Sequence, residues 1–139
     1  MDLRESASET AFRQEVRSWF EENLPPGWGA GVREPAEMGA RVAFLREWQG
    51  KLHAGGWMGL DWPVEYGGRG AGVVEQLIYN EEAVRARAPN LINLSVGTSL
   101  TGPTLIACGA QWQKERFLEP ILTGQDVWCQ GFSEPGAGS

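Results

Sequence analysis

The spacing of large apolar side chains is the feature that most constrains the fold. Phe12, Val16, Trp19 and Phe20 fall at positions i, i+4, i+7 and i+8. That spacing places them on one stripe of an α-helix, because an α-helix has about 3.6 residues per turn. The two prolines at positions 25 and 26 cannot continue a helix. The sequence therefore predicts an amphipathic helix over residues 8–24 that buries one face.

The same period recurs further along the chain, in segments bounded by glycine or proline. The prediction is an all-α fold in which several helices pack their apolar faces into one core. Pro120 lies inside the last of these segments, where it indicates a kink or a restart of the helix. The predicted helices cover residues 40–54, 73–87 and 110–123, with two further short buried helices between residues 91 and 109.

The predicted helix over residues 73–87 carries both apolar and charged positions. Glu81 and Glu82 precede Arg85 by four and three residues, a spacing that supports a helix. We interpret both glutamates as part of a solvated face and not as a catalytic acid pair. The expected apolar positions of the segment are Val74, Leu77, Ile78, Val84 and Ala88.

Residues 57–72 are rich in glycine and have no helical period. Gly68, Gly70 and Gly72 resemble a phosphate-binding loop only weakly, because no strand precedes them and the third glycine is misplaced. The segment is therefore predicted to be structural, with Trp62 and Tyr66 packing and the glycines making turns.

The end of the chain differs in character from the helical segments. Residues 126–132 include Val, Trp, Cys and Phe and predict a strand. A single strand after a helical run has no partner, and an unpaired strand exposes its backbone polar groups. We therefore expect a helical domain over residues 1–125, and the start of a β-domain over residues 126–139.

Composition argues against several classes of function. The net charge is −6 and the isoelectric point about 4.8, which disfavours nucleic-acid binding. Two cysteines and one histidine are too few for a zinc site. No stretch approaches the roughly 20 apolar residues of a membrane-spanning helix, and the N-terminus has no apolar signal core. We expect a cytoplasmic protein without nucleic-acid binding or membrane insertion.

The segment QGFSEPGAGS over residues 130–139 holds the groups best suited to a ligand. Ser133 offers a hydroxyl at the end of the predicted strand, and Gly136 and Gly138 allow a ligand to approach the backbone. Ser139 and the neighbouring amides could donate hydrogen bonds to a phosphate. Because glycine and proline also mark ordinary turns, a plain surface turn is the alternative.

Four motifs, in the same order and at similar spacing, resemble the acyl-CoA dehydrogenase family. They are WPVEYGGRG at 62–70, GPTL at 102–105, QKERFLEPIL at 113–122 and WCQGFSEPGAGS at 128–139. The sequence GFSEP is similar to the corresponding motif of bacterial family members that act on varied or bulky acyl-CoA thioesters. The resemblance implies the family's N-terminal helical-bundle domain, followed in the family by a middle β-domain and a C-terminal helical bundle, with FAD as the cofactor.

The resemblance also implies cofactor-binding residues. Gln130, Phe132 and Ser133 would line the flavin ring, and Gly138 and Ser139 would lie by the pyrophosphate. Serine at position 133 replaces the threonine that is frequent in the family and keeps its donor. Gln130 stands where an aromatic residue is frequent, and the family motif continues with an acidic residue after the position of Ser139.

For the substrate, the resemblance implies that the short helices of residues 91–109 close the far end of an acyl pocket. The expected substrate-binding residues are Leu94, Gly97, Thr98 and Thr101. Ordinary core packing is the alternative role for this tract. No residue is assigned as the catalytic base, because in the family a glutamate of the C-terminal domain removes the α-proton.

The expected reaction is the flavin-dependent α,β-dehydrogenation of an acyl-CoA thioester to the trans-2-enoyl-CoA. The expected partners are the acyl-CoA, an electron-transferring flavoprotein as acceptor, and further subunits in a homo- or hetero-oligomer. We expect the 139 residues alone to be inactive. One alternative is a non-catalytic helical interaction module or subunit fragment. Another is an acyl-CoA oxidase or flavin monooxygenase of the same fold.

Overall fold

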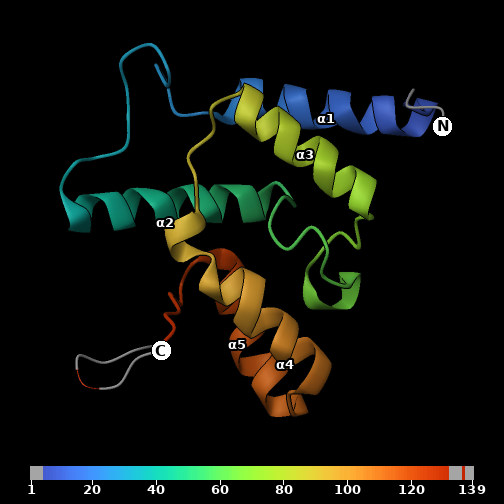
Figure 1. The fold of residues 1–139 in the computed structure, drawn as a ribbon, viewed down its shortest axis with the longest axis vertical. Coiled ribbons are helices and arrows are strands. Elements are labelled where there is room, and N and C mark those ends of the chain that lie inside the picture. The colour runs from blue at the N-terminus through green and yellow to red at the C-terminus, as the bar shows by residue number, and fades with distance from the viewer. Residues whose placement is uncertain (1–4, 132–135, 137–139) are drawn as a thin grey trace.

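The computed structural model describes residues 5–131 and 136. In this part of the chain every regular element is a helix, and no strand forms. Among the described residues, the one β-type contact is an isolated bridge between Trp28 and Val32. In Figure 1, α2 lies between the pair α1 and α3 on one side and the pair α4 and α5 on the other. The all-α prediction is confirmed. The α-helices are α1 (Ala7–Asn23), α2 (Met38–Ala54), α3 (Val73–Arg85), α4 (Gly102–Cys108) and α5 (Gln111–Thr123).

Local side-chain chemistry sets the ends of α1. The Ser6 hydroxyl accepts a hydrogen bond from the Glu9 amide at 3.2 Å, and the Glu9 carboxylate accepts one from the Ser6 amide at 2.6 Å. This reciprocal pair satisfies two amides that a helix start leaves without partners. The helix ends before Pro25, as the sequence predicts. Val16 and Phe20 form its buried stripe.

The core lies where α1, α2 and α5 meet the 57–62 segment. Phe20 of α1 stacks on Trp48 of α2 with ring centroids 6.5 Å apart, and Trp19 contacts both rings. Aromatic side chains bury large areas, so a few of them suffice for a core in a domain of this size. The buried cluster consists of Val16, Phe20, Trp48, Leu52, Trp57, Met58, Trp62, Leu118, Ile121 and Leu122.

The glycine-rich segment packs around Trp62, which is 2% exposed. Its indole donates a hydrogen bond to the Thr98 carbonyl at 3.1 Å. Backbone approaches this ring so closely that a Cβ at Gly102 would lie 1.9 Å from the ring, and one at Gly68 would lie 2.1 Å from the Trp62 carbonyl oxygen. The structural role predicted for this segment is confirmed, and a short 3₁₀ helix, η1 (Val64–Tyr66), lies inside it.

The tract over residues 91–109 is more continuous than expected. A 3₁₀ turn, η2 (Ile92–Leu94), is followed by a π-helical turn, η3 (Gly97–Thr101), which runs directly into α4. Pro103 lies in the first turn of α4 and has no amide to donate to the preceding helical turn, in which the Thr98 carbonyl accepts from the Trp62 indole.

Two expectations for α3 are wrong. Val74, Leu77 and Val84 are 49%, 57% and 78% exposed, whereas Ile78 is 2% exposed. Glu82, assigned to a solvated face, is also only 2% exposed. The reason is that α1 contacts a single narrow side of α3, and this side carries Ile78 and Glu82 one turn apart.

The strand predicted over residues 126–132 does not form within residues 126–131. A strand needs a neighbouring strand for its backbone hydrogen bonds, and the described residues offer none. Phe132 lies outside them. Across residues 5–131 and 136, no helix has the length and apolar character to cross a membrane.

Candidate functional site

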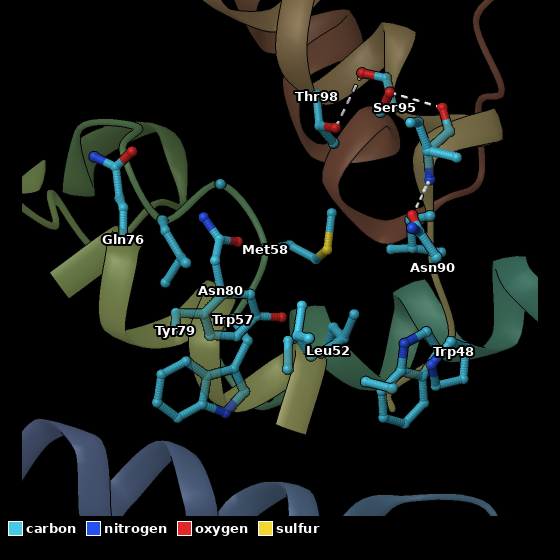
Figure 2. A pocket seen from close by; sticks show the side chains of 18 of the residues that line it. Trp48, Leu52, Trp57, Met58, Gln76, Tyr79, Asn80, Asn90, Ser95 and Thr98 are labelled. Atoms are coloured by element: carbon cyan, nitrogen blue, oxygen red, sulfur yellow. Dashed lines mark hydrogen bonds between the residues drawn. The ribbon is translucent and has the colours of Figure 1, made fainter. Parts of the chain in front are cut away.

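A cavity of about 800 Å³ opens between α2, α3, the loop after α2 and the tract that follows α3 (Figure 2). Residues 57–61 line it from the loop, and residues 87–92 line it beyond the end of α3. Ser95, Thr98 and Ser99 line it from η3 and the turn before it. The cavity thus joins segments far apart in the sequence, within the size range of small-molecule sites.

Aromatic and aliphatic side chains form one wall of the cavity. Figure 2 shows Trp48, Leu52 and Trp57 along this wall, with Met58 above them. Trp57 stacks on Tyr79 of α3 at 5.8 Å between ring centroids. Burial raises the pKa of the Tyr79 phenol, which therefore stays neutral at any physiological pH. This wall suits a carbon skeleton and not a charged group.

A second wall is one face of α3. Gln76, Asn80, Ala83 and Arg87 all line the cavity. Gln76, Asn80 and Ala83 follow at steps of four and three residues, which is the spacing of one helical stripe, and Arg87 lies two residues beyond the end of the helix. In Figure 2, Gln76 and Asn80 lie on this side, while Asn90 lies across the cavity from them. The α3 wall therefore brings carboxamides next to the apolar wall.

The polar side chains at the cavity differ in how far they are already satisfied. The Asn90 carboxamide oxygen accepts from the Ile92 amide at 2.8 Å, and the Ser95 hydroxyl donates to the Ile92 carbonyl at 2.8 Å. The Thr98 hydroxyl donates to the Ser95 carbonyl at 3.2 Å. Within the described chain, the Asn80 side chain makes no hydrogen bond. Its amide is thus available to a ligand.

A buried ion-pair cluster fixes α3 against α1, on the side away from the cavity. Glu82 accepts hydrogen bonds from the Arg17 guanidinium at 2.9 and 3.0 Å and from that of Arg13 at 2.9 Å. The bonds from Arg17, reinforced by Arg13 and opposed by burial, lower the pKa of Glu82 to about 2. Glu82 is therefore a structural anion and not a proton carrier.

The four residues expected to bind substrate are not brought to one place. Thr98 lines the cavity. Leu94 is buried, at 7% exposure, and Gly97 is buried against Ile121, where a Cβ would lie 3.1 Å from that side chain. Thr101 is half-buried and is not among the lining residues. Substrate binding by these residues stays a prediction, with Thr98 the best placed of the four.

The expected cofactor residues lie at the end of the chain. Gln130 is exposed, and a Cβ at its neighbour Gly131 would have nothing within 4 Å. Phe132, Ser133, Gly138 and Ser139 lie outside the described residues. Their assignment to the flavin stays a prediction.

Sequence reasoning missed most of the cavity. The walls from α2 and the loop were assigned only to core packing, and the polar stripe of Gln76, Asn80 and Arg87 was not recognised. The signal was present, because these three residues repeat at intervals of four and seven. Among residues 5–131 and 136, no group of three or more His, Cys, Asp or Glu side chains is placed to hold a metal ion.

Comparison with known proteins gives the class of this domain. The family profile for "Acyl-CoA dehydrogenase, N-terminal domain" matches residues 6–125. The acyl-CoA dehydrogenase IpdE1 of Mycolicibacterium smegmatis is 44% identical over 92% of this chain and 33% of its own length. The mitochondrial isovaleryl-CoA dehydrogenase of Pongo abelii is 31% identical over 96% of this chain and 30% of its own length.

Solved structures agree with this result. The Tcur3481-Tcur3483 steroid ACAD matches with a TM-score of 0.75 and 36% identity, over 99% of this chain and 34% of that one. The ChsE4-ChsE5 complex from Mycobacterium tuberculosis matches with a TM-score of 0.75 and 32% identity, over 99% of this chain and 33% of that one. The chain belongs to the acyl-CoA dehydrogenase family, through that family's N-terminal helical domain. It spans about a third of the length of these relatives.

Proposed function

We propose that this chain provides the acyl-binding side of a flavin-dependent enzyme that dehydrogenates acyl-CoA thioesters between the α and β carbons. The observation that carries the proposal is the cavity between α2, α3 and η3. It combines an apolar wall with neutral polar groups, as a site for an acyl group requires. Thr98, expected at such a site, is among its lining residues.

We further propose that the acyl group is bulky. A cavity of about 800 Å³ has room for more than a short linear chain. Two of the matched structures, those of Tcur3481-Tcur3483 and of a variant of it, are steroid ACADs. The flat indole and phenol rings of Trp57 and Tyr79 would favour a compact ring system by dispersion contacts.

FAD is the proposed cofactor, and it would accept the β-hydrogen as a hydride. The exposed Gln130 carboxamide and the open space at Gly131 are compatible with a planar ring beside this end of the described chain. We propose that Ser133 donates to the flavin ring and that Gly138 and Ser139 contact the pyrophosphate. The proton-abstracting base is not assigned among these residues, whose role is to bind and orient the acyl group.

The proposed partners follow from the same family. An electron-transferring flavoprotein would reoxidise the enzyme. A matched structure is a complex of two differently named proteins, ChsE4 and ChsE5, and we propose that this chain also works in an oligomer.

The proposed function is tested by a substitution whose larger side chain fills the cavity. Ser99 is exposed and lines the cavity, so a Ser99→Trp side chain would occupy space there without disturbing the core. In the enzyme that contains this chain, we expect the KM for a bulky cyclic acyl-CoA to rise at least tenfold, equivalent to about 1.4 kcal/mol. The assay follows bleaching of the flavin absorbance under anaerobic conditions.

The matched control is Ala107→Trp, which adds the same side chain to an exposed position of α4 outside the cavity. We expect its KM to equal that of the unmodified enzyme. Equal KM values for the two tryptophan variants would exclude the cavity as the acyl site. Flavin that no acyl-CoA bleaches in the unmodified enzyme would exclude the reaction itself.

A further inference from the structure

We propose that Arg87 determines specificity by binding a carboxylate at the far end of the acyl group. The inference rests on the proposed function and adds a substrate class to it, namely acyl groups that carry a second carboxylate. Arg87 is the only lysine or arginine among the residues that line the cavity. Its guanidinium makes no ion pair with any other described residue.

The charge of Arg87 is therefore uncommitted, whereas three other arginines are held by carboxylates. Arg13 and Arg17 are held by Glu82, and Arg69 is held by Glu15 at 2.8 Å. One carboxylate, that of Asp61, also lines the cavity, and it forms no ion pair with Arg87. A guanidinium presents paired N–H donors that match the two oxygens of a carboxylate.

The backbone at Arg87 supports a role for its side chain. Its φ is +53°, and it is the one residue other than glycine with a positive φ among the described residues. The equivalent position after α2, two residues beyond its last residue, is occupied by Gly56, at φ +74°. Glycine adopts this conformation with less strain than arginine. An arginine held in this region after a helix is an outlier that points to a function for the side chain.

Neighbouring groups fix this strained backbone at the edge of the cavity. The Arg87 amide donates to the Val84 carbonyl at 3.0 Å, and its carbonyl accepts from the Trp28 indole at 2.6 Å. Trp28 is itself stacked on Phe44 of α2 at 5.6 Å between ring centroids. The position of the Arg87 backbone is thus determined before any ligand binds, which reduces the entropy lost on binding.

The carboxylate, and not a phosphate of CoA, is the occupant that the cavity favours. The cavity that Arg87 lines also carries the side chains of Trp48, Leu52 and Met58, which would hold a carbon skeleton. Apart from Arg87 and Asp61, the polar lining groups are neutral. An acyl group that enters along the apolar wall would bring only its distal end to the guanidinium. The phosphates of CoA are attached at the opposite end, beyond the thioester.

The test compares suberoyl-CoA with octanoyl-CoA, two thioesters of equal chain length that differ in a terminal carboxylate. We expect Arg87→Gln and Arg87→Gly to lower kcat/KM for suberoyl-CoA at least tenfold relative to octanoyl-CoA. Arg87→Gly also relieves the backbone strain, so a loss of specificity in that variant is not a loss of folding. The control is Arg33→Gln, an exposed arginine outside the cavity, which should leave the ratio unchanged.

Calorimetric binding of both thioesters and of CoA alone to the same variants gives a readout without turnover. A tenfold loss of binding affinity confined to suberoyl-CoA supports the proposal. If the protein shows this loss but oxidises neither thioester, the proposed dehydrogenase function is wrong while the carboxylate site stands. An unchanged suberoyl-to-octanoyl ratio overturns it. Equal weakening of suberoyl-CoA, octanoyl-CoA and CoA also overturns it, because Arg87 would then bind the phosphates of CoA.

Discussion

Glu82 is the residue whose environment departs most from its sequence context. It stands beside Glu81 on a helix, yet it is 2% exposed while the Glu81 side chain is 52% exposed. Two guanidinium groups reach it from α1, because Arg13 and Arg17 are four residues apart and share one face of that helix. A buried carboxylate is tolerated when hydrogen bonds and opposite charges replace the water that it loses.

We expect Glu82→Gln to reduce the free energy of unfolding by about 1–3 kcal/mol at neutral pH, because a neutral amide replaces the carboxylate that accepts three charge-assisted hydrogen bonds from Arg13 and Arg17. Chemical denaturation measures this effect. The control is Glu81→Gln, which removes an exposed ion pair and should cost less than about 1 kcal/mol. Similar losses for the two variants would contradict a special role for the buried carboxylate.

The same residue makes stability depend on pH. The pKa of Glu82 falls from its ordinary value of 4.5 to about 2 on folding. Its contribution is therefore fully present above about pH 4.5 and is lost as the pH falls toward about 2. We expect the free energy of unfolding of Glu82→Gln to fall less steeply with decreasing pH in this window than that of the unmodified protein. Chemical denaturation at a series of pH values measures both.

At the level of the elements, sequence reasoning succeeded where local chemistry decides. The end of α1 follows from Pro25, as predicted, and its observed start, set by Ser6 and Glu9, lies one residue before the predicted residue 8. It failed where tertiary contacts decide, as in the choice of the buried face of α3. Ile78 and Leu77 look alike in the sequence, but only the side of α3 that meets α1 is buried. The predicted strand failed similarly, since a strand depends on a partner.

This difference predicts opposite outcomes at two adjacent positions of α3. Ile78→Ala should reduce the free energy of unfolding by about 2–5 kcal/mol, because it opens a cavity at a side chain that is 2% exposed. Leu77→Ala should change it by less than about 0.5 kcal/mol, because Leu77 is 57% exposed. Urea denaturation of both variants is the measurement. Comparable costs would mean that another surface covers Leu77 in solution.

At the scale of the whole molecule, the cavity and its supports arise from segments distant in the sequence. Figure 1 shows α2 in the middle, between the α1/α3 pair and the α4/α5 pair. Arg46 of α2 donates to the Gly124 carbonyl, 78 residues further along the chain. Gln49 of α2 donates to the Ile121 carbonyl, 72 residues further along. Such pairings have no local signature, so the sequence could predict the helices but not the cavity between them.

Gln49 links α2 to α5 and gives the last prediction. It is 3% exposed, and its amide donates to the Ile121 carbonyl at 2.7 Å and the Leu122 carbonyl at 3.3 Å. Carbonyls in the last turn of a helix need partners from outside that helix. Gln49→Leu removes this donor and should reduce the free energy of unfolding by about 1–3 kcal/mol. Hydrogen exchange of the backbone amides at the end of α5 should also accelerate.

The control is Gln125→Leu, at an exposed side chain. Equal amide exchange rates in the two variants would show that the end of α5 does not depend on the hydrogen bonds from Gln49.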